Sequence, residues 1–321
     1  MTCAIPYPLL REIQKYSQTH IVSPGLHALM DEITRRHGPG VKAILYYGSC
    51  LQSGKEFDGI VDLFVLVNDY GSVYKRPWLS FLNWLLPPNV FYLELPIEKG
   101  KRIRAKYAII SLADFLEKTS GKTFHSYFWA RFSQPVALIF FSHPRIKRAV
   151  ENGLACALMT FLKNVVPCAA PRFDAKKLWL TGLNLSYSAE LRPERAFRLE
   201  RLWAEQGEIL EAVTEVAIKA LPYEITVETE GEDILYLANI PRRACALCCT
   251  AWRFRRIYGK LLSVLRLFKA SFTFRAGVDY AIWKIKRHSG VQIEVSPFLR
   301  RHPALAMVVL SWRLFKSRAV R

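Results

Sequence analysis

The stretch from Val41 to Val67, VKAILYYGSCLQSGKEFDGIVDLFVLV, decides how the rest of this chain is interpreted. It opens with a short apolar run that ends at Gly48 and Ser49, and it closes with a second apolar run, rich in β-branched residues, that contains Asp62. β-Branched residues favour strands, whereas an aspartate is a poor strand former and is costly to bury without a partner. The stretch therefore predicts two strands joined by a Gly-Ser turn, with a carboxylate retained in the second strand.

A bound metal ion is the usual reason to keep a carboxylate in such a strand. Glycine lets backbone N–H groups approach a phosphate closely, and Ser49 adds a hydroxyl donor. Mg²⁺ held by Asp62 would bridge the phosphates and neutralise their charge. This is the chemistry of a minimal nucleotidyltransferase core, which usually has two carboxylates at positions i and i+2 of the strand. Here residue 60 is isoleucine, and Asp58 shares the face of Asp62 only if the strand begins that early. The alternative is a strand pair with a hydrogen-bonded aspartate and no metal.

The charge of the chain is concentrated near its end. The 321 residues carry a formal net charge of +19, of which +16 falls between residues 241 and 321. Such a local field indicates a polyanionic partner, either nucleic acid or an anionic membrane surface. Pro77–Leu93, the longest uncharged run, is interrupted by two prolines and is too short to cross a bilayer. The first residues lack the pattern of a signal peptide, so we expect the seven cysteines to be reduced.

Three of the cysteines lie close together in the basic region. Cys245, Cys248 and Cys249 have the spacing of half a metal site, but no second Cys or His pair accompanies them. We interpret them as buried thiols of a helix rather than as metal ligands.

The remaining patterns predict an α+β fold. It has a nucleotidyltransferase-like mixed sheet with helices, then a mainly helical domain with a small, winged-helix-like hairpin, and finally a basic C-terminal helix. The predicted domains are residues 1–143, 144–290 and 291–321. Helices are expected at 8–19, 25–37, 72–86, 145–162, 174–186, 197–220, 241–270, 278–288 and from about 303, with further strands at 90–95, 103–111, 135–141, 224–229 and 234–238.

Three further positions carry candidate chemistry. Lys106 lies among apolar residues of a predicted strand, where a lysine either reaches outward to solvent or points at a phosphate. Glu94 in the strand 90–95 is either a third metal carboxylate or a solvent-facing side chain. Tyr187, Glu190 and Arg192 follow a predicted helix, and by themselves they indicate only a surface ion pair.

In their order, five segments of the chain resemble the mitochondrial-type phosphatidate cytidylyltransferases, a family of peripheral CDP-diacylglycerol synthases. The segments are Tyr46–Ser49 for a YGSG-like turn, Val61–Phe64 for a strand with a single aspartate, Lys106–Ser111 for a KYGVIS-like strand, Gln134–Val136 for a QKPV-like segment and Leu185–Arg192 for an LSYSGDFR-like motif. The chain departs from the family at Cys50, which replaces a glycine, and at Glu190, which replaces an aspartate.

The resemblance implies a Mg²⁺-dependent reaction in which CTP and phosphatidate give CDP-diacylglycerol and pyrophosphate, a step toward phosphatidylglycerol and cardiolipin. Gly48 and Ser49 would cradle the β- and γ-phosphates, and Lys106 would neutralise a phosphate. Asp62 would hold Mg²⁺, with Glu190 as a second metal contact or as the group that orients the nucleophile. Asp58 is a weaker metal candidate, and Arg192 would clamp phosphatidate or the triphosphate through two hydrogen bonds.

A lipid substrate also explains the basic end of the chain. Residues 300–321 predict an interfacial amphipathic helix, with Trp312 and Phe315 on its apolar face and arginines at its edges. The alternative is a helix that packs its apolar face on the protein. We expect a peripheral protein on the cytoplasmic face of an inner membrane, or on the matrix side in a eukaryote.

Two other functions compete with this one. Another nucleotidyltransferase, acting on RNA or on a soluble small molecule, would share the turn and Asp62, although no known stacking motif for nucleic acid is present. A non-catalytic basic scaffold of the same fold would tolerate the non-standard residues at positions 50, 60 and 190.

Overall fold

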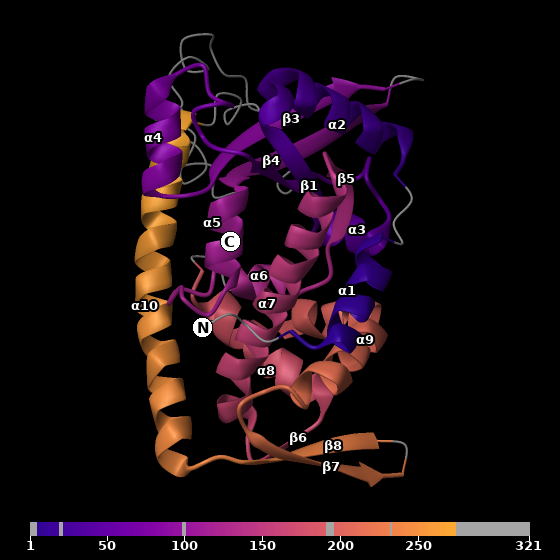
Figure 1. The fold of residues 1–321 in the computed structure, drawn as a ribbon, viewed down its shortest axis with the longest axis vertical. Coiled ribbons are helices and arrows are strands. Elements are labelled where there is room, and N and C mark those ends of the chain that lie inside the picture. Colours follow the sequence, from indigo (N-terminus) through magenta and orange to yellow (C-terminus); the bar gives the residue numbers. More distant parts are fainter. Residues whose placement is uncertain (1–4, 19–21, 98–100, 191–195, 232, 274–321) are drawn as a thin grey trace, which may run out of the picture.

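The computed structural model describes residues 5–18, 22–97, 101–190, 196–231 and 233–273. These residues form an α+β fold of ten α-helices, a mixed five-stranded sheet and a separate three-stranded sheet (Figure 1). None of the helices in these ranges is long and apolar enough to cross a membrane. The predicted helices at 278–288 and from about 303, and the segment 291–321, lie outside the described residues.

The central sheet contains the stretch on which the prediction rests. Its strand order is β3-β4-β2-β1-β5, with β2 and β4 parallel and the other neighbours antiparallel. The strands are β1 (Val41–Tyr47), β2 (Val61–Val67), β3 (Asn89–Pro96), β4 (Arg102–Ser111) and β5 (Ala137–Phe141). All five were predicted from their apolar, β-branched runs, and the mixed sheet is confirmed.

The pleat of β2 decides which way Asp62 faces. Successive side chains of a strand point to opposite faces of the sheet. Leu63 and Val65 pack in one buried cluster with α2 (Pro24–His37), whereas Phe64 and Leu66 pack in another cluster with the remaining helices. Asp62 shares the face of Phe64 and Leu66, so it points toward the helical side of the sheet.

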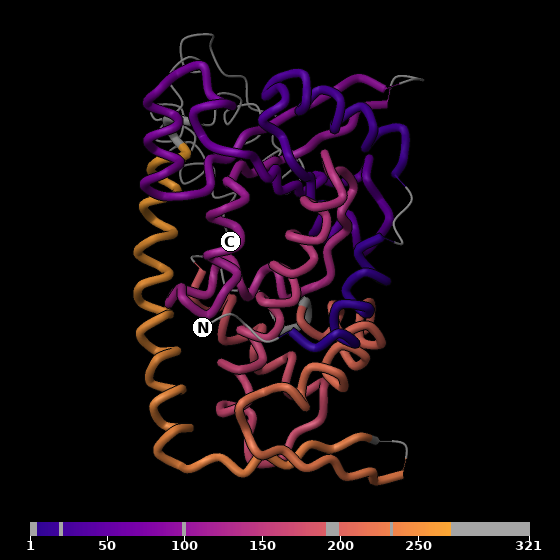
Figure 2. Tube along the Cα trace, in the orientation of Figure 1, coloured from indigo at the N-terminus to yellow at the C-terminus, as the bar shows by residue number. Residues whose placement is uncertain are grey.

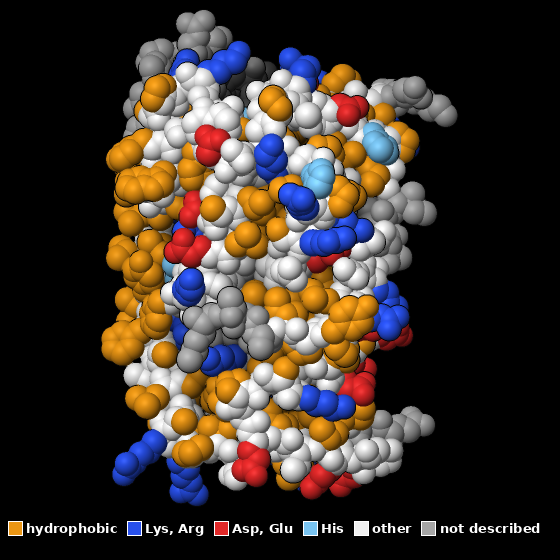
Figure 3. Space-filling model, in the orientation of Figure 1, with side chains coloured by type: hydrophobic (Ala, Val, Ile, Leu, Met, Phe, Trp, Pro, Cys, Tyr) orange, Lys and Arg blue, Asp and Glu red, His pale blue; other side chains and the backbone are white. Residues whose placement is uncertain are grey.

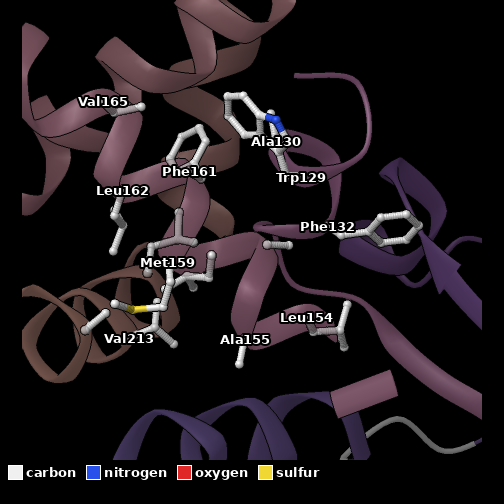
Figure 4. Close-up of a cluster of buried hydrophobic side chains, with 14 of the residues drawn as sticks. Trp129, Ala130, Phe132, Leu154, Ala155, Met159, Phe161, Leu162, Val165 and Val213 are labelled. Carbon is white, nitrogen blue, oxygen red and sulfur yellow. The ribbon is translucent and has the colours of Figure 1, made fainter. Parts of the chain in front are cut away.

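The helical side is a set of helices, some of which contact the sheet while the others pack on those helices. It contains α1 (Tyr7–Gln18), α5 (Leu112–Thr119), α6 (Trp129–Phe132), α7 (Pro144–Ala169), α8 (Ala175–Ser188) and α9 (Ala196–Ile218). Side chains of α6 and α7 belong to one buried cluster, in which Trp129 lies beside Phe161 and Val213 of α9 lies near Met159 (Figure 4). One buried cluster thus extends from β2 to α9, so the change from strands to helices near residue 143 is not a gap in the core.

A second sheet and a long helix complete the described part. The strands β6 (Arg172–Phe173), β8 (Asp233–Asn239) and β7 (Glu224–Glu230) form a sheet in that order, and β7 and β8 are the predicted hairpin. From this sheet α10 (Arg242–Thr273) runs along one edge of the molecule to α4 (Pro77–Leu85) (Figures 1 and 2). It packs on α7, α8 and β3 on the way.

Two predicted boundaries were wrong. The helix expected from residue 72 begins at Pro77, because the Asp69 carboxylate instead accepts the Ser72 N–H at 2.8 Å and forms a turn. Proline is favoured at the first position of a helix, since its missing N–H would have no partner there. The helix expected to end at residue 162 continues to Ala169. Four elements of the described residues, α3 (Ser49–Ser53), α5, α6 and β6, and a 3₁₀ turn at Gly38–Gly40 were not predicted.

Candidate active site

The Gly-Ser turn lies against the carboxylate of Asp62. Gly48 has φ 82° and ψ −168°, a conformation that essentially only glycine adopts. A Cβ atom on Gly48 would lie 3.0 Å from Asp62 Oδ2. Residue 48 is therefore glycine for two reasons, its backbone angles and the close approach of the carboxylate, and Ser49 follows at the start of α3.

Asp62 and Lys106 are neighbours in the register of β2 and β4. Lys106 Nζ lies 3.7 Å from Asp62 Oδ1, and both side chains are about one-third exposed. Burial would lower the pKa of Lys106, but the Asp62 carboxylate more than offsets it, so the pKa lies above its usual value. The strand thus presents a permanently charged ammonium beside a carboxylate.

A second ion pair closes the site from the helical side. Arg131 Nη2 of α6 donates to Glu190 Oε1, just beyond α8, at 2.7 Å. The Arg131 guanidinium also lies 4.5 Å from the centre of the Tyr127 ring and 5.9 Å from that of Tyr47. Burial lowers the pKa of Arg131, but the nearby Tyr127 and Glu190 have a larger effect in the opposite direction. The pKa of Arg131 therefore lies above its usual value.

Two more contacts fasten the surrounding elements. Tyr187 of α8 donates its hydroxyl hydrogen to Gln134 Oε1 at 3.1 Å. In the sequence, Gln134 lies three residues after Arg131 and Tyr187 lies three residues before Glu190. Arg266 of α10 lies 4.1 Å from the centre of the Tyr127 ring, which therefore has two guanidinium groups near it. Elements from residues 47 to 266 thus converge on one place.

That place is a cavity of about 750 Å³. Six of the seven predicted site residues line it: Gly48, Ser49, Asp58, Asp62, Lys106 and Glu190. The seventh, Arg192, lies outside the described residues. Five Lys or Arg side chains and four Asp or Glu side chains line the described part of the wall. Its cations are Lys55, Lys106, Arg131, Arg201 and Arg266.

The carboxylates fit a magnesium ion that arrives with a nucleotide better than a preformed metal cage. Among the described residues, no group of three or more His, Cys, Asp or Glu side chains could hold a metal. Mg²⁺ is commonly bound by one or two carboxylates together with substrate phosphates. Asp62 meets that need, because its oxygen lies over the Gly48 turn that would receive the phosphates. One Glu190 oxygen accepts from Arg131, so this carboxylate serves first to hold the guanidinium.

Glu94 and Cys50 are placed differently from the main candidates. Glu94 does not belong to the cavity wall that the structure describes, and it pairs with Arg102 at 3.2 Å and Arg104 at 3.3 Å. Cys50 is buried, and its thiol donates to Ile60 O at 3.2 Å. A Cβ on Gly59 would lie 2.5 Å from Cys50 Sγ, so the glycine at 59 makes room for the thiol.

The thiol cluster also differs from its prediction. Cys245 and Cys248 are half-buried and Cys249 is exposed, so the three are helical but not buried thiols. Cys168 of α7 lies with them, with its Sγ 3.2 Å from Cys249 Sγ and 3.9 Å from Cys248 Sγ.

Sequence reasoning singled out only Lys106 among the five cations of the cavity wall and missed Arg131 and Arg266, whose guanidinium groups lie near the Tyr127 ring. The signal for Arg131 is an arginine inside the aromatic run 127–132, three residues before Gln134. Arg266 had no comparable signal, because it is one of many basic residues in its region. No family model matches this chain, and no curated protein matches it either.

Proposed function

We propose that this protein is a phosphatidate cytidylyltransferase, which converts CTP and phosphatidate to CDP-diacylglycerol and pyrophosphate with Mg²⁺. The observation that carries the proposal is the convergence on one cavity of the Gly48–Ser49 turn, the Asp62–Lys106 pair and the Arg131–Glu190 pair. The segments that resemble the family come from five separate parts of the chain, and each contributes residues to the cavity wall.

The chemistry requires positioning and charge neutralisation more than a strong base. The phosphate monoester of phosphatidate is already an anion and attacks the α-phosphorus of CTP in line, with pyrophosphate as the leaving group. Gly48 and Ser49 would hold the β- and γ-phosphates, and Lys106 would neutralise one of them. When bound at Asp62, Mg²⁺ would supply further neutralisation of the triphosphate. Arg131, held by Glu190, would direct a guanidinium at the incoming phosphate.

The cavity suits substrates of this kind. Its volume falls within the range of roughly 300–1,000 Å³ typical of small-molecule sites. Lys106, Arg131 and Arg266 line it, whereas its four Asp and Glu side chains would repel a triphosphate unless a cation intervened. This balance supports a polyanionic substrate that brings a divalent cation with it.

The finer parts of the fold prediction belong to the same proposal. A nucleotidyltransferase-like core would be formed by the five-stranded sheet and α2, and the β7–β8 hairpin would be the winged-helix-like element. The peripheral position at an inner membrane, with segment 291–321 as an anchor, follows from the lipid substrate.

The test is an incubation of the purified protein with Mg²⁺, phosphatidate vesicles and each of the four α-³²P-labelled nucleoside triphosphates in turn. A labelled liponucleotide with CTP alone is expected. Asp62→Asn keeps the shape of the side chain and should abolish the product, whereas Asp58→Asn should reduce it less. Labelled RNA in place of lipid would favour the RNA-directed nucleotidyltransferase. Absence of turnover with every nucleotide, in a protein that still unfolds cooperatively, would favour the scaffold.

A further inference from the structure

One edge of the molecule exposes an apolar face made by two elements. On α4, Trp78, Phe81, Trp84 and Leu85 are exposed, and Trp84 has 66% of its surface accessible. On α10, six of the exposed apolar side chains follow helical spacing: Phe254, Ile257, Leu261, Val264, Leu265 and Phe268. Figure 3 shows hydrophobic side chains along the edge where Figure 1 places these helices. We call these ten residues the α4–α10 face.

The two helices are fastened together, so the face is one surface. Arg266 Nε donates to Pro87 O at 3.1 Å, directly after α4. Lys269 Nζ donates to Leu86 O and, at 2.8 Å, to Pro88 O. Lys269 is itself buried, so the residues that follow α4 pack closely on the last turns of α10.

The opposite side of α10 is part of the cavity wall. Gly259, Leu262, Ser263 and Arg266 line the cavity, at spacings of three and four residues. A Cβ on Gly259 would lie 2.6 Å from Ala189 O, next to Glu190, so α10 packs closely on the end of α8. A single helix therefore separates the candidate active site from the exposed apolar face.

The charged residues of α10 itself, and those of the segment that contains α4, are all basic. The helix α10 contains eight Lys or Arg residues and no Asp or Glu, and six of those cations are not buried. Lys75 and Arg76 are exposed just before α4, and no acidic residue occurs from residue 70 to residue 93. An apolar surface bordered by cations and aromatic rings matches a bilayer with anionic headgroups.

Other occupants fit these observations less well. A second copy of the chain would bring two sets of cations together, and residues 274–321 carry ten Lys or Arg against two acidic residues, so they would do the same. A nucleic acid would pair with the cations but would leave the large apolar side chains exposed to water.

We propose that the α4–α10 face docks on an anionic lipid bilayer, with α10 lying along the interface between the bilayer and the cavity. The proposal deepens the proposed function, on which it rests for the identity of the lipid that enters the cavity. Docking itself requires no turnover. Docking on the α4–α10 face places the bilayer one helix away from the Arg131–Glu190 pair, so that an anionic headgroup has a short path to the cavity.

The test compares full-length protein variants in flotation with phosphatidylcholine vesicles, with and without phosphatidylglycerol. The triple variant combines Phe254→Gln, Ile257→Gln and Leu261→Gln, because these side chains are exposed and do not line the cavity. Tyr7→Gln combined with Val227→Gln removes exposed apolar side chains elsewhere. The wild type and this control should float with the anionic vesicles, less so at high salt, and the triple variant should bind about tenfold more weakly.

A second measurement separates docking from catalysis. Cytidylyl transfer to a water-soluble short-chain phosphatidate should be the same in the triple variant and the wild type, which also shows that the variant folds. Transfer to phosphatidate in vesicles should fall with binding. Wild-type flotation by the triple variant would overturn the proposal, as would a wild-type dimer that the triple variant converts to monomer. Face-dependent flotation without transfer to any substrate would keep the docking surface and reject the cytidylyltransferase.

Discussion

Asp62 and Lys106 occupy matched positions on the adjacent parallel strands β2 and β4, with Lys106 Nζ 3.7 Å from Asp62 Oδ1. Parallel neighbours in register present side chains on the same face of the sheet. The pair therefore brings a metal-binding type of group and a phosphate-binding type of group to one point, and the carboxylate helps to hold the pKa of Lys106 above its usual value. Backbone pairing, rather than a mobile loop, fixes their separation.

The Lys106→Met variant should separate catalysis from stability. Loss of this cation is expected to reduce kcat for CDP-diacylglycerol formation by about 10²–10³-fold, as for other groups that stabilise developing charge. The free energy of unfolding should change by less than about 1 kcal/mol, because the ion pair is partly exposed to solvent. Steady-state kinetics and urea unfolding measure the two effects. Lys15→Met, at a highly exposed position, is the control, and wild-type turnover by Lys106→Met would contradict the assignment.

The Gly48→Ala variant tests the turn. The conformation of Gly48 disfavours any side chain, and the new methyl group would press on Asp62 Oδ2. We expect a loss of about 1–3 kcal/mol in the free energy of unfolding and a loss of most activity. Gly54→Ala is the matched control, because Gly54 also has a positive φ but has open space where its Cβ would be. It should cost about 1 kcal/mol and leave activity intact. Equal activity losses in both variants would remove the special role of Gly48.

The sheet could be predicted from sequence because its signals are local. The strands β1, β2, β3, β4 and β5 are each a short apolar run, and the Gly-Ser turn and Asp62 lie within 27 residues of one another. The start of α4 was misplaced because aromatic periodicity was followed back through the Asp69–Ser72 turn. Local patterns therefore predicted the strands, whereas the start of α4 was wrong because the Asp69 side chain accepts a backbone N–H there.

The helical wall of the site could not be predicted in the same way. Arg131 and Glu190 are 59 residues apart, and their contact depends on how α6 and α8 pack. Arg266 differs from its basic neighbours only in which side of α10 it occupies, and that is fixed by tertiary packing. The cluster of Cys168 with Cys249 likewise joins two helices that are distant in sequence.

The Arg131–Glu190 contact should show energetic coupling. Arg131→Met and Glu190→Gln each remove one partner, and the double variant completes a cycle. We expect a coupling free energy of about 1 kcal/mol or more, because the 2.7 Å contact is largely shielded from water. Urea unfolding of the four proteins measures it. The Arg201–Glu205 pair on the exposed part of α9 is a control, for which coupling of a few tenths of a kcal/mol is expected. Additive effects at Arg131 and Glu190 would contradict the expectation.

Lys269 should make stability depend on pH in a defined window. Burial, followed by the charge of Arg266, lowers the pKa of Lys269 from 10.5 to about 7 in the folded protein. Between these pH values the unfolded chain holds a proton that the folded chain has released, so the free energy of unfolding rises with pH. The Lys269→Met variant has no amino group at this position, so neither its folded nor its unfolded state binds this proton. The stability of the variant relative to the wild type should therefore be highest at or below pH 7 and should fall by up to about 1 kcal/mol per pH unit above it. Urea unfolding across this window tests the slope, with Lys260→Met on the same helix as a control, and a constant difference would contradict it.

The thiols at the junction of α7 and α10 should form a cross-link on oxidation. Cys168 Sγ lies 3.2 Å from Cys249 Sγ, so a shift of about 1 Å brings the sulfur atoms to bonding distance. With diamide, two thiols lose two protons and two electrons and the azo group becomes a hydrazine, so no other reactant is needed. Peptide mass spectrometry should join Cys168 to Cys249, or to Cys248 at 3.9 Å, but not to Cys156. The bond closes a long loop and ties α10 to the core, which should raise the free energy of unfolding by about 2–4 kcal/mol, and dithiothreitol should reverse the gain. Cys168→Ser removes the shared partner and should abolish both effects. A cross-link that persists in Cys168→Ser, or one that forms without stabilising the protein, would mean that α10 does not pack on α7 at this point.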